Sequence, residues 1–181
     1  MNIRKITYIL GAFLIISLLQ SCPDRYKNRE DIAANIAEYA DLITITPLQQ
    51  IYQQGDEIVL KITVDATNTY FGGEAKNLHQ ITGNDKARLN TSIYTLFEDN
   101  EFEMIKGSQG ESINEYYLLY NPTNGKYELE IKIILTTTGI NILNAKGFIH
   151  FKGSDKYNSF FLDTNVEGMD EQGLVAFKVL P

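Results

Sequence analysis

The strongest constraint on the fold is a two-residue alternation of apolar and charged side chains within residues 127–135. Apolar side chains occupy every second position, at Tyr127, Leu129, Ile131, Ile133 and Leu135. Charged side chains stand between them, at Glu128, Glu130 and Lys132. Because successive residues of a strand point to opposite faces, this pattern is typical of a strand with one buried and one solvated face. The chain is therefore expected to build a sheet that is covered on one side.

Several other segments look like strands, and turn signals rich in Gly, Asn, Asp and Pro separate them. The expected strands are 43–46, 57–64, 92–97, 113–120, 147–152, 158–165 and 174–180. Asn124-Gly125, the pair favoured in two-residue hairpins, stands just before the 127–135 strand. Residues 67–92 are polar and are expected to form a long connection. We therefore expect an all-β domain of about seven or eight strands, a sandwich or a barrel.

Composition supports strands and excludes some partners. The chain has 11 Tyr, 9 Phe and no Trp, and aromatic and β-branched residues favour strands over helices. It carries 23 acidic and 16 basic residues, a formal charge of −7. This charge argues against nucleic acid as a partner, which needs a clustered basic face, and against electrostatic attachment to anionic lipid. With one cysteine, no disulfide can form within the chain, so the fold depends on its hydrophobic core.

The N-terminus has the pattern of a secretory signal. Arg4 and Lys5 precede an apolar run from Ile6 to Leu19, and the only cysteine, Cys22, follows shortly afterwards. The run of 14 residues is short for a bilayer span, which needs about 20 residues. It matches the apolar region of a signal peptide behind a basic start.

The residues Leu19-Gln20-Ser21-Cys22 resemble the lipobox of bacterial lipoproteins. The resemblance implies diacylglycerol on Cys22, cleavage after Ser21 and a third acyl chain on the new amino group. Two or more chains are enough for stable anchoring. Gln20 is a less common occupant of its position. The alternatives are an uncleaved N-terminal anchor helix and a plain signal peptide followed by an unrelated cysteine.

The sequence thus predicts three parts. Residues 1–21 are the cleaved signal peptide, 22–41 a lipidated tether, and 42–181 a single β domain. Removal of residues 1–21 would leave 160 residues and a formal charge of −9, since that segment holds two basic and no acidic residues. Within the tether, Ile32, Ile36 and Tyr39 recur at helical spacing, which indicates a short amphipathic helix; a disordered linker is the alternative.

Two segments resemble immunoglobulin-like domains. Residues 46–58 look like the passage from the first to the second strand of such modules, and 124–129 look like the turn before their F strand. The resemblance implies an antiparallel β-sandwich and a tyrosine-corner role for Tyr127, whose hydroxyl would bond to backbone a few residues upstream. Leu129 stands where the second cysteine would be, and the likeness covers about residues 42–138. The order of lipidated cysteine, tether and β domain resembles that of small Gram-negative lipoproteins. The resemblance implies attachment to the outer membrane and does not say whether the domain lies on its periplasmic side or on the cell surface.

Aromatic residues are the candidate ligand-binding side chains. They are Tyr116, Tyr117, Tyr120, Tyr157, Phe160 and Phe161. In an adjacent pair on a strand, one ring is expected to face outward. Outward rings can stack on a sugar or a protein partner, or simply cover the sheet.

Evidence for a metal site is weak. Asp163, Asn165 and Glu167 resemble the start of a calcium loop, but position twelve is Leu174 instead of a carboxylate. A solvated acidic hairpin loop is the alternative. His79 and His150 are 71 residues apart, and no third zinc ligand is evident. We expect strand alternation to place His150 opposite Phe148 and Phe151. We expect no metal and no cofactor.

No nucleophile elbow or phosphate loop is present in the sequence. We therefore expect a membrane-anchored, non-enzymatic binding or interaction module of the cell envelope. Its partners would be the bilayer, through the acyl chains on Cys22, and a protein or a glycan. The alternatives are an envelope hydrolase with dispersed acidic residues and a structural accessory subunit of an outer-membrane assembly.

Overall fold

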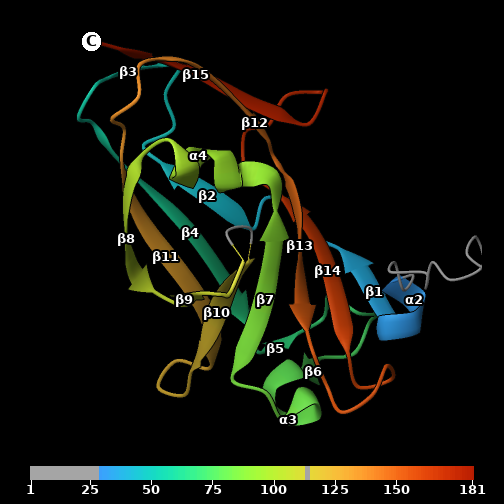
Figure 1. Ribbon diagram of the computed structural model, residues 1–181. Coiled ribbons are helices and arrows are strands. Elements are labelled where there is room, and N and C mark those ends of the chain that lie inside the picture. Colours follow the sequence, from blue (N-terminus) through green and yellow to red (C-terminus); the bar gives the residue numbers. More distant parts are fainter. Residues whose placement is uncertain (1–28, 113–114) are drawn as a thin grey trace, which may run out of the picture.

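The protein is all-β in the computed structural model, which describes residues 29–112 and 115–181 (Figure 1). This confirms the predicted class. Cys22 and the predicted signal peptide lie outside the described residues. Among the described residues, no helix is long and apolar enough to cross a membrane.

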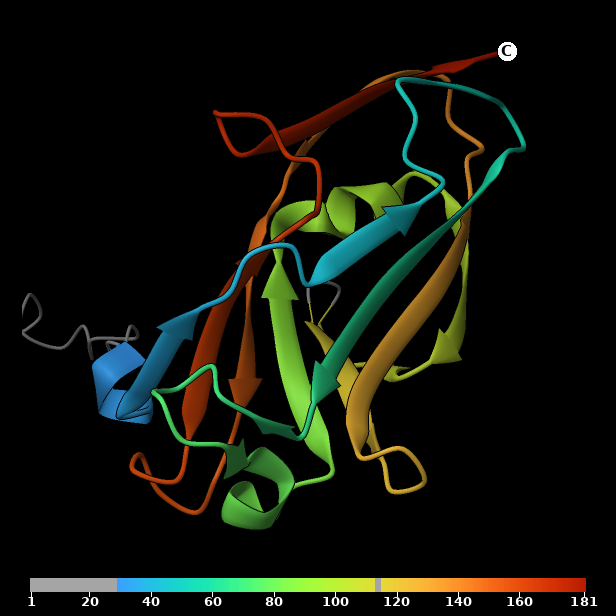
Figure 2. The ribbon, with the colours of Figure 1, turned by 180° about the vertical axis from the view of Figure 1, so that it is seen from behind.

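A large curled sheet dominates the fold. Eight strands follow one another across it, in the spatial order β1 (Asn35–Glu38), β14 (Phe160–Asn165), β13 (Lys146–Phe151), β7 (Lys86–Thr91), β10 (Glu115–Asn121), β11 (Lys126–Ile134), β4 (Glu57–Asp65) and β2 (Ile43–Thr46). Two more strands extend it, β8 (Glu101–Lys106) beside β11 and β9 (Ser108–Gln109) beside β10. Neighbours are antiparallel except β1, which runs parallel to β14. The arrangement is one curled sheet of ten strands with smaller elements around it (Figures 1 and 2).

Smaller elements close the two ends of the curl. At one end lie the sheet of β12 (Gly139–Asn144), β15 (Leu174–Leu180) and β3 (Ile51–Gln53), with η1 (Ser92–Tyr94) and α4 (Thr95–Glu98) (Figures 1 and 2). At the other end lie α3 (Leu78–Thr82) and the pair of β5 (Thr67–Asn68) and β6 (Lys76–Asn77). The short helix α2 (Arg29–Ile32) lies beside β1 and β14 (Figure 1).

The core lies on the inner face of the curl. The alternating apolar positions of β11 and β4 face it, and those of β4 are at most 1% exposed: Ile58, Leu60, Ile62 and Val64. All five apolar positions of 127–135 are fully buried, as the alternation predicts. A turn forms at Asn124-Gly125, but residues 122–125 make up the loop between the paired Asn121 and Lys126, so it is not a two-residue hairpin. Gly125 has φ of +68°, which glycine adopts without steric cost, and its N–H donates to the Asn121 carbonyl at 2.8 Å.

Tyr127 has a different partner from the one that the tyrosine-corner resemblance implies. Its hydroxyl donates to the Asn84 carbonyl at 2.6 Å, 43 residues earlier in the chain. The ring also packs against Phe151 of β13, with centroids 5.1 Å apart. Tyr127 therefore connects β11 to the start of β7 and to β13 across the core.

The structure corrects two secondary-structure predictions near the N-terminus and at 92–97. Ile36 lies in β1, which pairs with β14, so residues expected in a tether helix contribute a strand to the main sheet. Residues 92–97 form η1 and the start of α4 instead of a strand. Helical spacing there lets Ile93, Leu96 and Phe97 enter the core together, at 0, 0 and 5% exposure. Burial of this apolar stripe outweighs the strand propensity of the segment.

Several strands were not predicted, and β7, β8 and β12 are the longest of them. β7 lies within the polar stretch that we expected to be a connection, β8 follows the acidic residues Glu98 and Asp99, and β12 begins at Gly139. On β7 the inward residues Ala87, Leu89 and Thr91 are small or isolated, so the hydrophobic signal is weak although the residues are buried. Tertiary pairing with β10 and β13 makes β7 a central strand.

A cluster of polar side chains links β8, β10 and β11 at the point along β11 where its pairing changes from β10 to β8. The Glu128 carboxylate accepts from Lys106 Nζ at 2.8 Å, from Asn121 Nδ2 at 3.0 Å and from Asn124 Nδ2 at 3.3 Å. These bonds, led by the one from Lys106, lower the pKa of Glu128 to about 2. A carboxylate that is 8% exposed is thereby kept charged and fully bonded.

Candidate binding site

The outer face of the large sheet carries a continuous row of side chains across five strands. Strand register places these residues directly beside one another in the order Ile36, Phe161, His150, Arg88 and Tyr117. A second row, one step along the strands, holds Glu38, Asp163, Phe148, Asn90 and Glu115. The rows show that residues scattered between positions 36 and 163 meet on one face because of the strand order.

Within the described residues a wide groove opens over the first row. Its volume is about 1030 Å³, and it is lined by Ile32, Asn84, Lys86, Arg88, Ser108, Gln109, Gly110, Glu111, Glu115, Tyr117, His150 and Lys152. We call this surface the basic groove, because Lys86, Arg88 and Lys152 outnumber its carboxylates, Glu111 and Glu115. It extends from the β9 edge, across β10, β7 and β13, to Ile32 of α2.

His150 forms part of the floor of the basic groove and is only 7% exposed. Its ring stacks on Phe161, with centroids 4.3 Å apart and planes 8° apart. Burial, followed by the positive charges of Arg88 and Lys152, lowers the pKa of His150 to about 4. The imidazole is therefore neutral at neutral pH.

Arg88 is held loosely. Its Nη1 is 3.4 Å from Oε1 of Glu115, which is long for a charge-assisted hydrogen bond. Arg88 Nε and His150 Nε2 are both buried and have no hydrogen-bond partner among the described residues. Buried polar atoms are nearly always satisfied, so two neighbouring exceptions mark this floor as unusual.

Tyr117 forms the side of the groove toward β9. Lys86 Nζ lies 5.7 Å from its ring centroid, a cation–π contact. Burial, followed by Glu115, raises the pKa of the Tyr117 hydroxyl. Gly110 lets the β9 edge approach Glu115 closely, since a Cβ there would lie 2.6 Å from a carboxylate oxygen.

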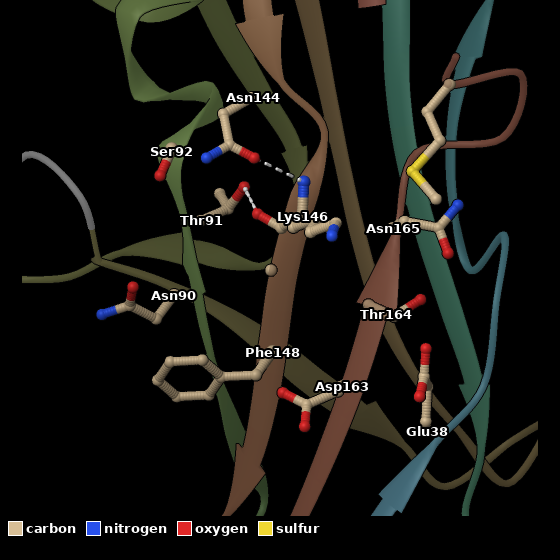
Figure 3. Close-up of a pocket in the computed structure, with 12 residues that line it drawn as sticks. Glu38, Asn90, Thr91, Ser92, Asn144, Lys146, Phe148, Asp163, Thr164 and Asn165 are labelled. Carbon is tan, nitrogen blue, oxygen red and sulfur yellow. Dashed lines mark hydrogen bonds between the residues drawn. The ribbon is translucent and has the colours of Figure 1, made fainter. Parts of the chain in front are cut away.

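A smaller hollow of about 440 Å³ lies over the second row (Figure 3). It is lined by Glu38, Asn90, Thr91, Ser92, Asn144, Lys146, Gly147, Phe148, Asp163, Thr164, Asn165 and Met169. Figure 3 shows Glu38 and Asp163 on neighbouring strands, as the register of β1 and β14 requires. The Lys146 N–H donates to Asn144 Oδ1 at 3.1 Å, and Thr91 Oγ1 donates to the Lys146 carbonyl at 3.5 Å. Amides and carboxylates of this kind can bind sugar hydroxyls.

The structure does not gather the six predicted aromatic residues on one face. Tyr116 and Phe160 point into the core, at 0 and 2% exposure. Tyr120 stacks on His79 with centroids 3.8 Å apart, and Tyr157 is 70% exposed in a loop. Only Tyr117 and Phe161 share a row, and Tyr117 lines the basic groove.

The expectation that one ring of each doublet faces solvent is wrong for Phe160-Phe161. Phe161 is on the outer face but is 2% exposed, because the rings of His150 and Phe148 pack against it. The placement of His150 also needs correction. It shares the outer face with Phe148, two residues away, and only Phe151 is opposite, in the core.

The calcium alternative gains no geometric support. Asn165 is 7% exposed, and its amide donates to Asp41 Oδ1 at 2.7 Å and to the Val166 carbonyl at 2.9 Å. Glu167 is exposed beyond the end of β14. In the part of the chain that the structure describes, no three His, Cys, Asp or Glu side chains are grouped to hold a metal ion.

Sequence reasoning missed Lys86, Arg88 and Lys152. The first two alternate with Ala87 and Leu89, so the period-two signal was present but rested on only two apolar side chains. Lys152 immediately follows β13, at the end of the expected strand 147–152, where its charge gives no sign of a shared groove. Comparison of the chain with protein-family models, curated proteins and solved structures found no match.

Proposed function

We propose that this protein is a lipid-anchored, non-enzymatic binding module of the bacterial cell envelope, and that it binds a glycan in the basic groove. The immunoglobulin-like relationship and outer-membrane location are part of the proposal. The anchor depends on the Leu19–Cys22 motif. The basic groove is the observation that carries the binding function, because it joins a large open volume to polar donors and one aromatic ring.

A glycan suits this groove better than a protein surface. Ile32 and Tyr117 are the large apolar or aromatic side chains at its rim, and most other lining residues are polar or charged. The centre of a protein interface is usually depleted of charge and rich in aromatic anchors. Sugars instead need hydrogen-bonding groups around a ring on which to stack.

Changing Cys22 to Ala tests the anchor. The variant is expected to leave the membrane fraction, because the cysteine sulfur is the site of the thioether to diacylglycerol. Cell fractionation and labelling with a radioactive fatty acid measure the change. Changing Ser21 to Ala, which keeps a small residue before the cysteine, is the matched control and should remain lipidated. A Cys22→Ala protein that stays in the membrane with its first 21 residues attached would contradict the anchor.

Glycan retention tests the binding function. The detergent-purified full chain is expected to retain envelope and host-type polysaccharides on an array and to return them unchanged in length. The chemistry is binding, so product analysis after incubation should show no shortened chains. Shortened products would instead identify a hydrolase, with Glu38 and Asp163 as the first carboxylates to test. Retention of no glycan at all would contradict the proposal.

A further inference from the structure

We infer that the basic groove binds an anionic polysaccharide, with Arg88 contacting its carboxylate or sulfate group. The inference rests on the proposed binding function and adds the charge class of the glycan. Three separate observations support it. The groove has more positive than negative side chains although the whole chain is negative, Arg88 makes one long ion pair, and the floor of the groove is buried.

The charge of the groove is opposite to that of the whole chain. The protein has a formal charge of −7, yet Lys86, Arg88 and Lys152 line one groove with two carboxylates. Arg88 and Lys152 both act on the pKa of His150, which shows that their charges converge on the same ring. A groove with an excess of positive charge favours ligands of negative charge locally, even on a protein whose net charge is negative.

Arg88 has donors to offer. A guanidinium carries five N–H groups in a planar fork that matches a carboxylate or sulfate. Among the described residues its one ion pair is the 3.4 Å contact with Glu115, and its side chain is 39% exposed. An anion in the groove would give Arg88 shorter, bidentate hydrogen bonds than Glu115 provides.

The floor strengthens this attraction. His150 is buried and neutral, and its stack with Phe161 places an apolar layer directly beside Arg88. Charges interact more strongly over such a layer than in open water. His150 Nε2, buried in the floor of the groove, has no hydrogen-bond partner among the described residues.

The size of the groove indicates a chain of sugars and not a small ion. Its volume of about 1030 Å³ is at the upper end of pockets that hold drug-sized ligands, which are about 300–1000 Å³. An inorganic anion would fill a small part of it. Tyr117 beside Arg88 supplies a ring for sugar stacking, and Lys86 and Lys152 lie further along to meet a second charge.

The test measures affinity of the detergent-purified full chain for four probes. They are polygalacturonate, dextran sulfate, neutral dextran and polyglutamate, assayed at about 50 mM and about 300 mM salt. We expect binding to polygalacturonate or dextran sulfate that weakens with salt, and none to neutral dextran. The two acidic glycans separate carboxylate from sulfate recognition, and either supports the inference.

The variants are Arg88→Gln and a matched control, Lys61→Gln, which removes one charge from the outer face of β4, away from the groove. Arg88→Gln is expected to weaken acidic-glycan binding by about tenfold or more, and Lys61→Gln to leave it within about twofold. Lys152→Gln, at an exposed site, should weaken binding too and serves if Arg88→Gln fails to fold.

Three outcomes would overturn the inference. Equal weakening by Lys61→Gln would show that only net charge matters. Tight binding of neutral dextran would refute the anionic class but leave the proposed glycan binding intact. Binding of polyglutamate without either acidic glycan would assign the groove to an acidic protein partner and refute both proposals.

Discussion

Replacing Tyr127 with alanine is expected to lower the free energy of unfolding by about 4 kcal/mol, the usual cost of removing a large buried aromatic side chain. Tyr127 is fully buried and its ring lies within 5.4 Å of those of Phe151 and Tyr120, measured between centroids. The change would leave a cavity between β11 and β13 and would orphan the Asn84 carbonyl, which accepts from the hydroxyl at 2.6 Å. Urea denaturation measures the effect.

Two control variants separate the causes. Tyr127→Phe keeps the ring and should cost about 1–2 kcal/mol, because the hydrogen bonding of the hydroxyl, to the Asn84 carbonyl above all, is lost. Tyr157→Ala makes the same chemical change at a side chain that is 70% exposed, and should alter the free energy of unfolding by no more than about 0.5 kcal/mol. If Tyr127→Ala were as mild as Tyr157→Ala, the described packing of the core around β11 would be wrong.

Acidification is expected to destabilise the protein between about pH 6.5 and pH 4, mainly through His150. Burial lowers the pKa of His150 to about 4 in the folded chain, whereas an unfolded histidine titrates near 6.5. The unfolded state thus binds more protons in this window, so the free energy of unfolding rises with pH and falls on acidification. The loss at pH 4 relative to pH 7 is on the order of 3 kcal/mol.

His150→Phe tests the assignment. Phenylalanine keeps an aromatic ring to stack on Phe161 but cannot titrate, so its free energy of unfolding should change little between pH 6.5 and 4. Glu128 remains in the variant; its lowered pKa of about 2 removes stability only below about pH 4.5. The two windows are therefore separable by urea denaturation at several pH values. A His150→Phe variant with the same pH dependence as the unmodified chain would rule out His150 as the source.

Long alternating segments were predictable because the alternation identifies both the type of secondary structure, a strand, and the face of the strand that is buried. The strands expected at 43–46, 57–64, 127–135, 147–152, 158–165 and 174–180 all form, with ends shifted by two residues or fewer. In 57–64, for example, the four apolar residues at alternate positions reach the core, and the fifth, Val59, lies on the other face. A one-residue shift of register would expose all of them, so the sequence leaves little choice.

Elements that depend on distant partners were not predictable. β7 has two small or modest apolar residues, Ala87 and Leu89, and becomes a strand because β10 and β13 lie on both sides of it. β1 looked helical, yet it pairs in parallel with β14, more than 120 residues away. Residues 92–97 have strand propensity but fold as short helices to bring Ile93 and Leu96 into the core.

The candidate site follows the same division. The sequence named Tyr117 only as one of six aromatic candidates, because a doublet on a strand turns one ring outward but does not say which one. Arg88, His150 and Phe161 come from three strands and become neighbours only through the order β14-β13-β7. The spacing of these residues in the sequence does not indicate the order of the strands in the sheet.

The sequence by itself determined the β class, the buried face of the main strands and the absence of a disulfide, because alternation and residue counts are local properties. It also supplied the expectation of a lipid on Cys22. The tertiary structure alone decided that the sheet curls into one layer of ten strands, and that three cations line one groove whose floor includes the buried His150. Strand order and burial create that arrangement, since the pKa of His150 and the charge of the groove depend on neighbours that the chain brings together only when it folds.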